Sequence, residues 1–254
     1  MEQYTGKKAV IIGGTTGIGL ATGLALVKGG AQVLLTGQTE THLEATRGQV
    51  GTQADVVCFN MASIADIHRL YELIEEKLGQ VDFVFMNAGV ARLEPFDQVT
   101  EATYDQVFNV NTKGAFFTAQ RLAPLVKEGG AFVFTTSIAD GRGTPGMGVY
   151  AGSKAALRAF AQVLAAELLP RSIRVNIVSP GFIKTETMGA AGLPQAEREA
   201  FEKVGDQITP MKRHGTVEEV ARAVLFLAFD ATFTTGSTLF VDGGLAQGLT
   251  PPRQ

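Results

Sequence analysis

The chain reads Ala9-Val10-Ile11-Ile12-Gly13-Gly14-Thr15-Thr16-Gly17-Ile18-Gly19 near its N-terminus. The four apolar residues suit a short strand that is buried on both faces of a sheet. Glycine permits a tight turn and a close approach of the backbone to a bound anion, and the helix that follows aims free N–H groups at the same place. This stretch therefore predicts a strand, a turn and a helix whose N-terminus can bind a phosphate group.

Short apolar runs keep alternating with longer helical patterns along the 254 residues. We expect strands at 9–12, 32–35, 56–59, 82–86, 131–135, 174–178 and 239–241, and helices at 18–28, 41–50, 64–78, 101–127, 150–168 and 217–229. This order predicts an α/β fold of Rossmann type, a doubly wound parallel sheet of about seven strands with helices on both faces. Residues 1–254 are expected to form a single domain, in which Ser63 and Thr100 cap helices and Leu169-Pro170 ends the 150–168 helix.

Charge and hydropathy argue against several classes of partner. The net charge is −3 and the Lys and Arg residues are scattered, so neither nucleic acid nor an anionic membrane surface is an expected partner. No apolar run reaches the roughly 18 residues that span a bilayer. Because the first apolar run is also too short for a signal peptide, we expect a cytoplasmic protein.

The cysteine and histidines give no sign of a metal site. Cys58 is the only cysteine and ends an apolar run, so we expect a buried structural thiol. His42, His68 and His214 lie far apart in the sequence without companion ligands. We expect these three to be surface residues, and we expect no bound metal.

Tyr150 and Lys154 stand four residues apart in a predicted helix, with Ser137 upstream. Residues at this spacing share one helical face. A phenol has an ordinary pKa of about 10, and a fixed ammonium group beside it would lower that pKa into a useful range for proton transfer. Tyr4 and Lys8 have the same spacing, but they lie beside Gly6 before the first strand, where no helix is expected to hold them together.

With these motifs the chain resembles the classical short-chain dehydrogenase/reductases, from residue 8 to about residue 244. The resemblance rests on the glycine-rich turn, Asn87-Ala88-Gly89, Asn111, the Ser137, Tyr150 and Lys154 set, Pro180-Gly181 with Ile183 and Thr185, and Val241-Asp242-Gly243-Gly244. It departs from the family at Ile12, where Thr is usual, and at Asn60, where an Asp usually accepts a hydrogen bond from adenine. An Asn carbonyl can accept the same bond.

The resemblance implies an enzyme that moves a hydride between a nicotinamide cofactor and a ketone or secondary alcohol. The catalytic residues would be Asn111, Ser137, Tyr150 and Lys154. Tyr150 would exchange the proton, Lys154 would lower the tyrosine pKa and bind the nicotinamide ribose, Ser137 would bind the substrate oxygen, and Asn111 would hold a water through its backbone carbonyl. The implied cofactor contacts are Gly13, Thr15, Thr16, Gly17, Ile18, Gly19, Gly37, Gln38, Asn60, Met61, Asn87, Ala88, Gly89, Tyr150, Lys154, Pro180, Gly181, Ile183 and Thr185.

The nicotinamide cofactor is expected to be NADP rather than NAD. An acidic residue at the end of the second strand would bind the ribose 2′-OH of NAD and repel the 2′-phosphate of NADP. That position is Gly37, followed by Gln38 and Thr39. No carboxylate excludes the phosphate, and no Lys or Arg in the segment holds it, so NAD remains the alternative.

Residues 185–212 are expected to form a lid over the substrate. The segment offers Gly189, Gly192 and Gly205 as hinges and Met188, Leu193, Phe201, Ile208 and Met211 as apolar contacts, which suits a fairly apolar ketone or alcohol. The alternative is a surface insertion with its own small core. Asp140 and Arg142 follow Ser137 closely, and we expect them to form an exposed ion pair in a loop.

Two other functions stay open at this stage. The chain could be a 3-oxoacyl carrier-protein reductase, whose acidic partner would need a basic docking patch, with only Arg92 and Arg142 near the mouth. It could also be a non-catalytic nucleotide-binding interaction protein that keeps the fold.

The helix at 150–168 also predicts an assembly. Its polar stripe is narrow, consisting of Lys154, Arg158 and Gln162, while alanines occupy much of the remaining surface. A second helix could approach such a surface closely. We therefore expect a homo-oligomer, a tetramer or a dimer, built on this helix and the one at 101–127.

Overall fold

The computed structural model describes residues 3–185 and 195–249, with seven of their strands in one parallel sheet in the order β3-β2-β1-β4-β5-β6-β9. The strands are β1 (Lys8–Ile12), β2 (Gln32–Gly37), β3 (Ala54–Cys58), β4 (Val81–Met86), β5 (Val126–Thr135), β6 (Arg174–Pro180) and β9 (Thr238–Val241). The strand order reverses at β1, where the chain crosses from β3 back to β4. The predicted Rossmann-type fold is confirmed, and its ligand crevice is expected at this reversal.

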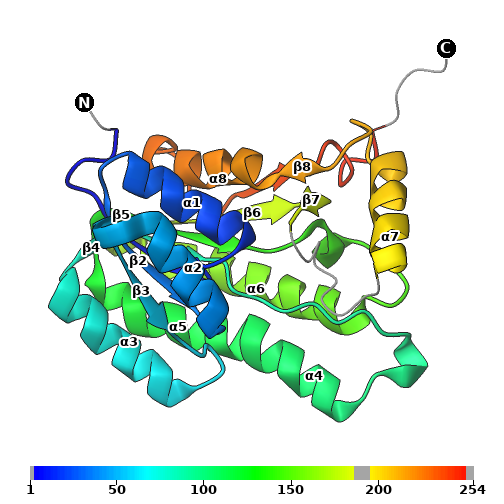
Figure 1. Ribbon diagram of the computed structural model, residues 1–254, viewed down its shortest axis with the longest axis horizontal. Coiled ribbons are helices and arrows are strands. Elements are labelled where there is room, and N and C mark those ends of the chain that lie inside the picture. The colour runs from blue at the N-terminus through cyan, green and yellow to red at the C-terminus, as the bar shows by residue number, and fades with distance from the viewer. Residues whose placement is uncertain (1–2, 186–194, 250–254) are drawn as a thin grey trace.

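Helices cover both faces of the sheet (Figure 1). One face carries α1 (Gly17–Lys28), α2 (Glu40–Val50) and α8 (Val217–Leu225), and the other carries α3 (Ile64–Lys77), α4 (Glu101–Phe108), α5 (Ala115–Leu122) and α6 (Gly148–Glu167). Helix α7 (Gln195–Ile208) stands beyond the edge of these layers (Figure 1). A small parallel sheet of β7 (Ile183–Lys184) and β8 (Gly215–Thr216) lies near it.

Strand β1 shows why its sequence is apolar throughout. Its residues Ala9 to Ile12 are all fully buried, and they alternate between the two sides of the sheet. Val10 and Ile12 belong to the cluster under α3, α5 and α6, whereas Ala9 and Ile11 belong to the cluster under α1 and α8. A strand that faces two cores needs apolar side chains at every position.

The prediction of one continuous helix at 101–127 is wrong in its middle and at its end. The structure has α4, a π-helical segment η3 (Asn109–Gly114) and α5, and then a 3-10 turn η4 (Ala123–Leu125) before β5 begins at Val126. Pro124 lacks the backbone donor that a continuing helix requires. The expected caps are confirmed: Ser63 accepts from Asp66 N, and Thr100 accepts from Thr103 N.

Two predictions about single residues are wrong. Cys58 is exposed because β3 is the outermost strand of the sheet, and its sulfur lies 4.0 Å from the Gln38 carbonyl oxygen. His214 is buried, with only 5% of its side chain exposed, because α7 packs over it and supplies Asp206 as a partner for Nδ1 at 2.7 Å. His68 is exposed as expected, whereas His42 is partly buried.

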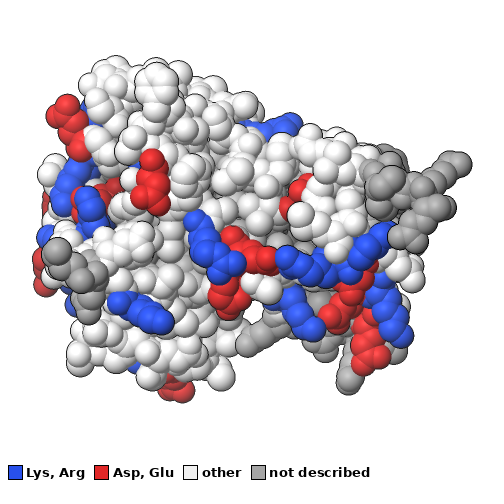
Figure 2. All heavy atoms as spheres, turned by 90° about the horizontal axis from the view of Figure 1, so that it is seen from above, with Lys and Arg blue, Asp and Glu red and all other residues white. Residues whose placement is uncertain are grey.

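Charges on the surface are mixed. On the face shown in Figure 2, basic and acidic side chains lie next to one another instead of forming one basic field. Lys184 with Glu202 and Arg213 with Glu219 are two of the ion pairs of the described residues. Among the residues that the structure describes, no helix has the length and apolarity needed to cross a membrane.

Candidate active site

A cavity of about 420 Å³ opens at the carboxyl ends of β1, β4, β5 and β6. It is lined by residues from the glycine-rich turn, from the segments after β4 and β5, from the start of α6 and from the segment after β6. Twelve of the residues expected at a site from the sequence line it: Thr16, Gly17, Ile18, Asn87, Gly89, Ser137, Tyr150, Lys154, Pro180, Gly181, Ile183 and Thr185. The fold therefore brings most of the sequence motifs to one hollow.

Gly13 and Gly19 of the glycine-rich turn have no room for a side chain. Gly13 has φ +80°, and a Cβ there would lie 2.7 Å from the backbone of Ala88. A Cβ on Gly19 would lie 2.0 Å from the Gly13 carbonyl oxygen, so α1 could not start so close to the turn. This close packing leaves the N-terminus of α1 facing the cavity, as the binding of a phosphate group requires.

Asn87 fixes the turn to its neighbouring strands. Its Nδ2 donates to the Gly13 carbonyl at 3.0 Å, and its Oδ1 accepts from the Thr135 hydroxyl at 3.1 Å. One side chain after β4 thus joins the end of β1 to the end of β5. The sequence identified Asn87 through a motif, and the structure gives the physical reason for an amide, which donates and accepts at once.

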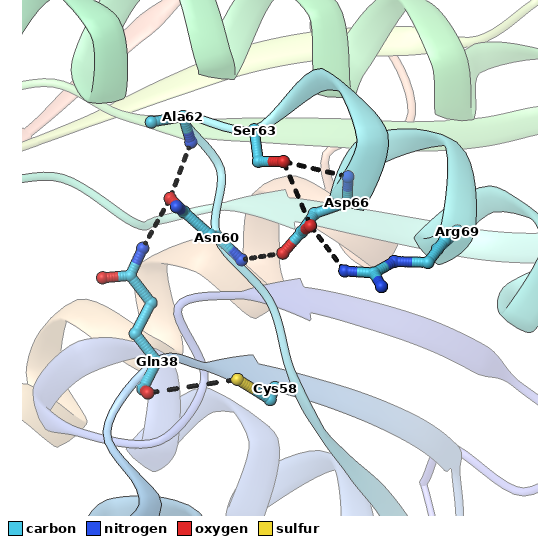
Figure 3. A network of polar contacts seen from close by, with 7 residues as sticks. All are labelled: Gln38, Cys58, Asn60, Ala62, Ser63, Asp66 and Arg69. Atoms are coloured by element: carbon cyan, nitrogen blue, oxygen red, sulfur yellow. Dashed lines mark hydrogen bonds and ion pairs between the residues drawn. The ribbon is translucent and has the colours of Figure 1, made fainter.

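A polar network around Asn60 follows the carboxyl end of β3 (Figure 3). Asn60 Oδ1 accepts from Gln38 Nε2 and from Ala62 N, both at 3.0 Å, and Asn60 N donates to Asp66 at 3.1 Å. Both acceptor positions of the Asn60 carbonyl are therefore in use. An adenine amino group can be accepted there only if the exposed Gln38 side chain gives way.

Other expected cofactor residues lie behind the cavity wall. Thr15 is buried, and a Cβ on Gly37 would meet its hydroxyl at 2.3 Å, so the end of β2 has no room for a side chain. Met61 is 2% exposed and belongs to the core under α3. Its side chain is thus part of the core and not of the cavity lining.

Asn111 lies in the π-helical segment between α4 and α5 and is fully buried. Its Oδ1 accepts from Val90 N at 2.8 Å, and its Nδ2 donates to Val90 O at 2.8 Å and to Ser153 Oγ at 3.0 Å. The Ser153 hydroxyl in turn donates to the Tyr150 carbonyl. Asn111 therefore ties the segment after β4 to the turn of α6 that carries Tyr150.

Tyr150, Lys154 and Ser137 share the central part of the cavity. Ser137 ends the segment after β5, where its hydroxyl accepts from Ala139 N at 3.2 Å. Lys154 is 3% exposed, and its Nζ donates to the Thr135 carbonyl at 2.9 Å. The same Nζ lies 6.0 Å from the centre of the Tyr150 ring.

Burial and neighbouring groups shift the pKa values of Tyr150 and Lys154. Burial raises the pKa of Tyr150, a hydrogen bond with Ser137 lowers it, and the negative charge of Asp140 raises it. The Lys154 ammonium donates its hydrogen bond to Thr135 O. Burial lowers the pKa of Lys154 to about 8, against the opposing effect of Asp140.

Asp140 and Arg142 do not form the expected exposed ion pair. The Asp140 side chain is 2% exposed and pairs with Arg158 of α6 at 3.3 Å. Arg142 lines the cavity and donates to the carbonyl of Leu245, close to the C-terminal motif. Sequence reasoning missed the Asp140 and Arg158 pair because the two lie 18 positions apart and only the packing of η5 (Ile138–Gly141) against α6 brings them together.

Part of the expected lid lies within the described residues. Ile208 lines the cavity, Met211 is exposed, and Gly205 packs against the His214 ring. Phe182 and His214, which lie outside the expected lid, also line the cavity. The expected residues Met188, Gly189, Gly192 and Leu193 lie outside the described residues, as does the side chain of Phe201. The sequence also gave no hint that Asp206 and His214 pair beneath α7.

Comparisons with known proteins agree with this geometry. Residues 13–246 match the family model described as enoyl-(acyl carrier protein) reductase. The chain is 38% identical to the oxidoreductase asL5 of Sarocladium schorii, over 97% of this chain and 98% of that protein. It is 36% identical to the 3-oxoacyl-(acyl-carrier-protein) reductase FabG of Thermotoga maritima, over 96% and 99%.

Solved structures are similar over the same length. A short-chain dehydrogenase/reductase of Serratia marcescens, solved as a double mutant, matches with a TM-score of 0.87 and 30% identity, over 96% of this chain and 99% of that one. Levodione reductase matches with a TM-score of 0.86 and 27% identity over the same shares.

Proposed function

This chain belongs to the short-chain dehydrogenase/reductase family and is an oxidoreductase of that family. From this premise we propose that it transfers a hydride between a nicotinamide cofactor and the carbonyl carbon of a ketone or the corresponding secondary alcohol. The observation that carries the proposal is that Ser137, Tyr150 and Lys154 line one cavity with the glycine-rich turn. The cavity thus has room for a dinucleotide end beside groups that can move a proton.

Tyr150, Ser137 and Lys154 have different roles at the substrate oxygen. Tyr150 donates a proton to that oxygen during reduction and accepts it during oxidation, and Ser137 donates a hydrogen bond to the oxygen as negative charge develops there. Lys154 keeps a positive charge near both. The nicotinamide, when bound, supplies or accepts the hydride.

The cofactor would be held along the line of residues from the turn to the segment after β6. The N–H groups at the start of α1 would bind the pyrophosphate, and Pro180, Gly181, Ile183 and Thr185 would flank the nicotinamide. Asn111 acts through Val90 and Ser153 as a positioning residue for the Tyr150 turn, in addition to the water-holding role that the family resemblance implies.

We favour NADP over NAD as the cofactor. Gly37 leaves no carboxylate at the end of β2, and Thr15 fills the space where such a side chain would begin. The 2′-phosphate therefore meets neutral donors, among them Gln38 and Thr39, and no repelling charge. The ratio of kcat/KM for the two cofactors tests this choice, and a tenfold preference for NAD would reject it.

The substrate is proposed to be a fairly apolar ketone or alcohol. Val90, Leu93, Ile138, Met147, Phe182 and Ile208 supply much of the lining of the cavity. A 3-oxoacyl thioester is the second candidate, because one relative at 36% identity carries the name of such a reductase. A comparison of simple aryl ketones with 3-oxoacyl thioesters as substrates separates the two.

We also propose a homo-oligomer in which α4, α5 and α6 meet a second copy. Phe116, Phe117, Phe160 and Val163 are exposed on these helices, and the first three line a shallow apolar hollow. Isolated exposed apolar residues are ordinary, but a cluster of aromatic side chains is typical of an interface. A dimer or tetramer is the expected state.

The proposal also includes the domain organisation and a lid over the substrate. Residues 1–254 would form a single catalytic domain in which residues 185–212 close over the substrate. Helix α7 and the Ile208 side chain at its end stand at the cavity in a position that suits such a lid. A cytoplasmic location stays a prediction from the sequence.

The experiment that tests the function is a panel of carbonyl compounds, assayed with NADPH and with NADH. Loss of the reduced nicotinamide absorbance with at least one ketone supports the proposal. Tight binding of a cofactor without turnover of any carbonyl compound would favour a non-catalytic nucleotide-binding protein instead.

A further inference from the structure

Asp140 is a buried carboxylate beside the proposed active site that the reaction described above does not use. Its side chain is 2% exposed, and Oδ1 lies 3.3 Å from Nη1 of Arg158, whose own side chain is 34% exposed. Asp140 follows Ser137 by three residues in the short helix η5. Carboxylates are rarely buried to this extent unless a cation offsets the loss of solvent.

The Asp140 carboxylate contacts the face of α6 that also carries Tyr150 and Lys154. Tyr150, Lys154 and Arg158 follow one another at intervals of four residues, so the phenol, the ammonium and the guanidinium lie on one helical face. Because Asp140 pairs with Arg158, its carboxylate is held against this face, one helical turn beyond Lys154. Arg158 and Lys154 are thus the cations that face Asp140, and Tyr150 is the further titratable group.

We propose that Asp140 is a positioning residue whose carboxylate, held by Arg158, keeps the Lys154 ammonium charged inside the protein and thereby sets the pH range of the reaction. The proposal rests on the proposed function of Tyr150 and Lys154. It adds a buried charge to the site that neither the motifs nor the comparisons assign.

Burial raises the pKa of Asp140, whereas the charge of Arg158, a hydrogen bond with Thr136 and the charge of Lys154 lower it, so these groups favour the charged carboxylate. Burial lowers the pKa of Lys154 to about 8, and the charge of Asp140 opposes this effect. The same charge raises the pKa of Tyr150, after burial. Removal of the negative charge therefore lowers both pKa values, and the Arg158 cation left behind acts in the same direction.

Asp140→Asn tests the proposal through the pH dependence of carbonyl reduction. Reduction needs a protonated Tyr150 and a charged Lys154, so kcat/KM falls on the alkaline side when either loses its proton. Because both pKa values fall in the variant, this alkaline limb should move to lower pH by about half a unit or more, as expected for the loss of a nearby charge in a partly dry site. Asp140→Glu, which keeps the carboxylate, should restore the limb towards the wild-type position.

A matched control is Asp55→Asn. Asp55 makes an exposed ion pair with Lys77 at 2.7 Å, so the substitution is chemically identical but distant from the cavity. It should leave the alkaline limb in place. If Asp140→Asn lowers kcat without moving the limb, or if Asp140→Glu behaves like Asp140→Asn, the role is structural and the proposal is overturned.

A second measurement needs no turnover and so separates this proposal from the proposed function. The tyrosinate absorbance of the folded protein is titrated in the wild type and in Asp140→Asn. Each titration is compared with that of the same protein carrying Tyr150→Phe in addition. The difference isolates Tyr150, whose pKa should be lower when Asp140 is neutral. An unchanged Tyr150 titration in a folded variant contradicts the proposal even if the enzyme proves active.

Discussion

The Nζ of Lys154 lies 6.0 Å from the centre of the Tyr150 ring and donates its hydrogen bond to the Thr135 carbonyl. The two side chains therefore share one helical face, and the ammonium is held by a carbonyl at the end of β5. Burial is the largest effect on the pKa of Tyr150 and raises it. The phenol hydroxyl shares a hydrogen bond with Ser137, the other group proposed to bind the substrate oxygen.

Tyr150→Phe should remove nearly all turnover without unfolding the protein. The substitution deletes only the hydroxyl, and the ring keeps its contacts along the cavity wall. We expect at least a 100-fold loss, on the order of the contribution of a general acid or base. The rate of carbonyl reduction checks the first part and circular dichroism the second; activity close to that of the wild type would rule out Tyr150 as the proton donor.

Carbonyl reduction by the wild type should fall as the pH rises through about 8. Lys154 has its pKa lowered to about 8 by burial, so its positive charge is lost in this range. The check is kcat/KM for reduction against pH, with the protein shown to stay folded. A rate that stays constant to pH 10 would contradict a role for the Lys154 charge.

Lys154→Met should abolish activity but stabilise the protein at pH 7. The folded state holds a buried ammonium whose pKa is about 8, against 10.5 for an ordinary lysine, so burial of the charged form costs free energy below pH 8. We expect the free energy of unfolding to rise by roughly 1 kcal/mol, because the lost hydrogen bond to Thr135 offsets part of the gain.

The same lysine gives the pH dependence of stability a definite sign. Between about pH 8 and pH 10.5 the folded state binds fewer protons at Lys154 than the unfolded state does. The contribution of this group to the free energy of unfolding therefore rises with pH across that window. Urea denaturation at several pH values should show this rise in the wild type relative to Lys154→Met; parallel curves for the two proteins would contradict it.

Gly19→Ala should abolish cofactor binding. The new Cβ would lie 2.0 Å from the Gly13 carbonyl oxygen, so the turn and α1 must move apart. The dissociation constant of NADPH, measured by its fluorescence, should increase at least tenfold. Gly48→Ala in α2 is the control, because nothing lies within 4 Å of its Cβ, and it should leave binding unchanged while adding about 0.5–1 kcal/mol of stability.

Phe160→Glu should dissociate the proposed oligomer. Phe160 packs edge to face on Phe116, with 5.2 Å between the ring centres. A carboxylate at position 160 would be buried in the interface without a partner. The mass from light scattering should fall towards that of one chain. Phe233→Glu, at a fully exposed position elsewhere, should not change the mass. A wild-type mass of one chain would refute the interface itself.

The fold follows from local signals that the sequence carries openly. The apolar strands of the main sheet, such as β1 and β6, are recognisable because both of their faces are buried. The helix caps at Ser63 and Thr100 are recognisable because their side chains bond to residues three positions later. Most of the nucleotide crevice was identifiable because its residues cluster in short motifs at the strand ends.

The rest depends on contacts between distant segments. Asp140 becomes buried only because α6 brings Arg158 to it, and His214 only because α7 covers it. Cys58 ends an apolar run, yet it is exposed because β3 lies at the edge of the sheet. The π-helical segment around Asn111 has no sequence signature of its own, since it arises where α4 and α5 join.

The central claim is that this site moves a hydride to a carbonyl carbon with Tyr150 as the source of the proton. The most direct measurement is the deuterium content of the alcohol product. The wild type and Tyr150→Phe are each incubated with the same ketone and with a reduced nicotinamide cofactor that carries deuterium at the transferred position. We predict that the wild type forms an alcohol with deuterium on the former carbonyl carbon, and that Tyr150→Phe binds the cofactor but forms almost none. An alcohol without deuterium, or equal amounts from the two proteins, would contradict the account.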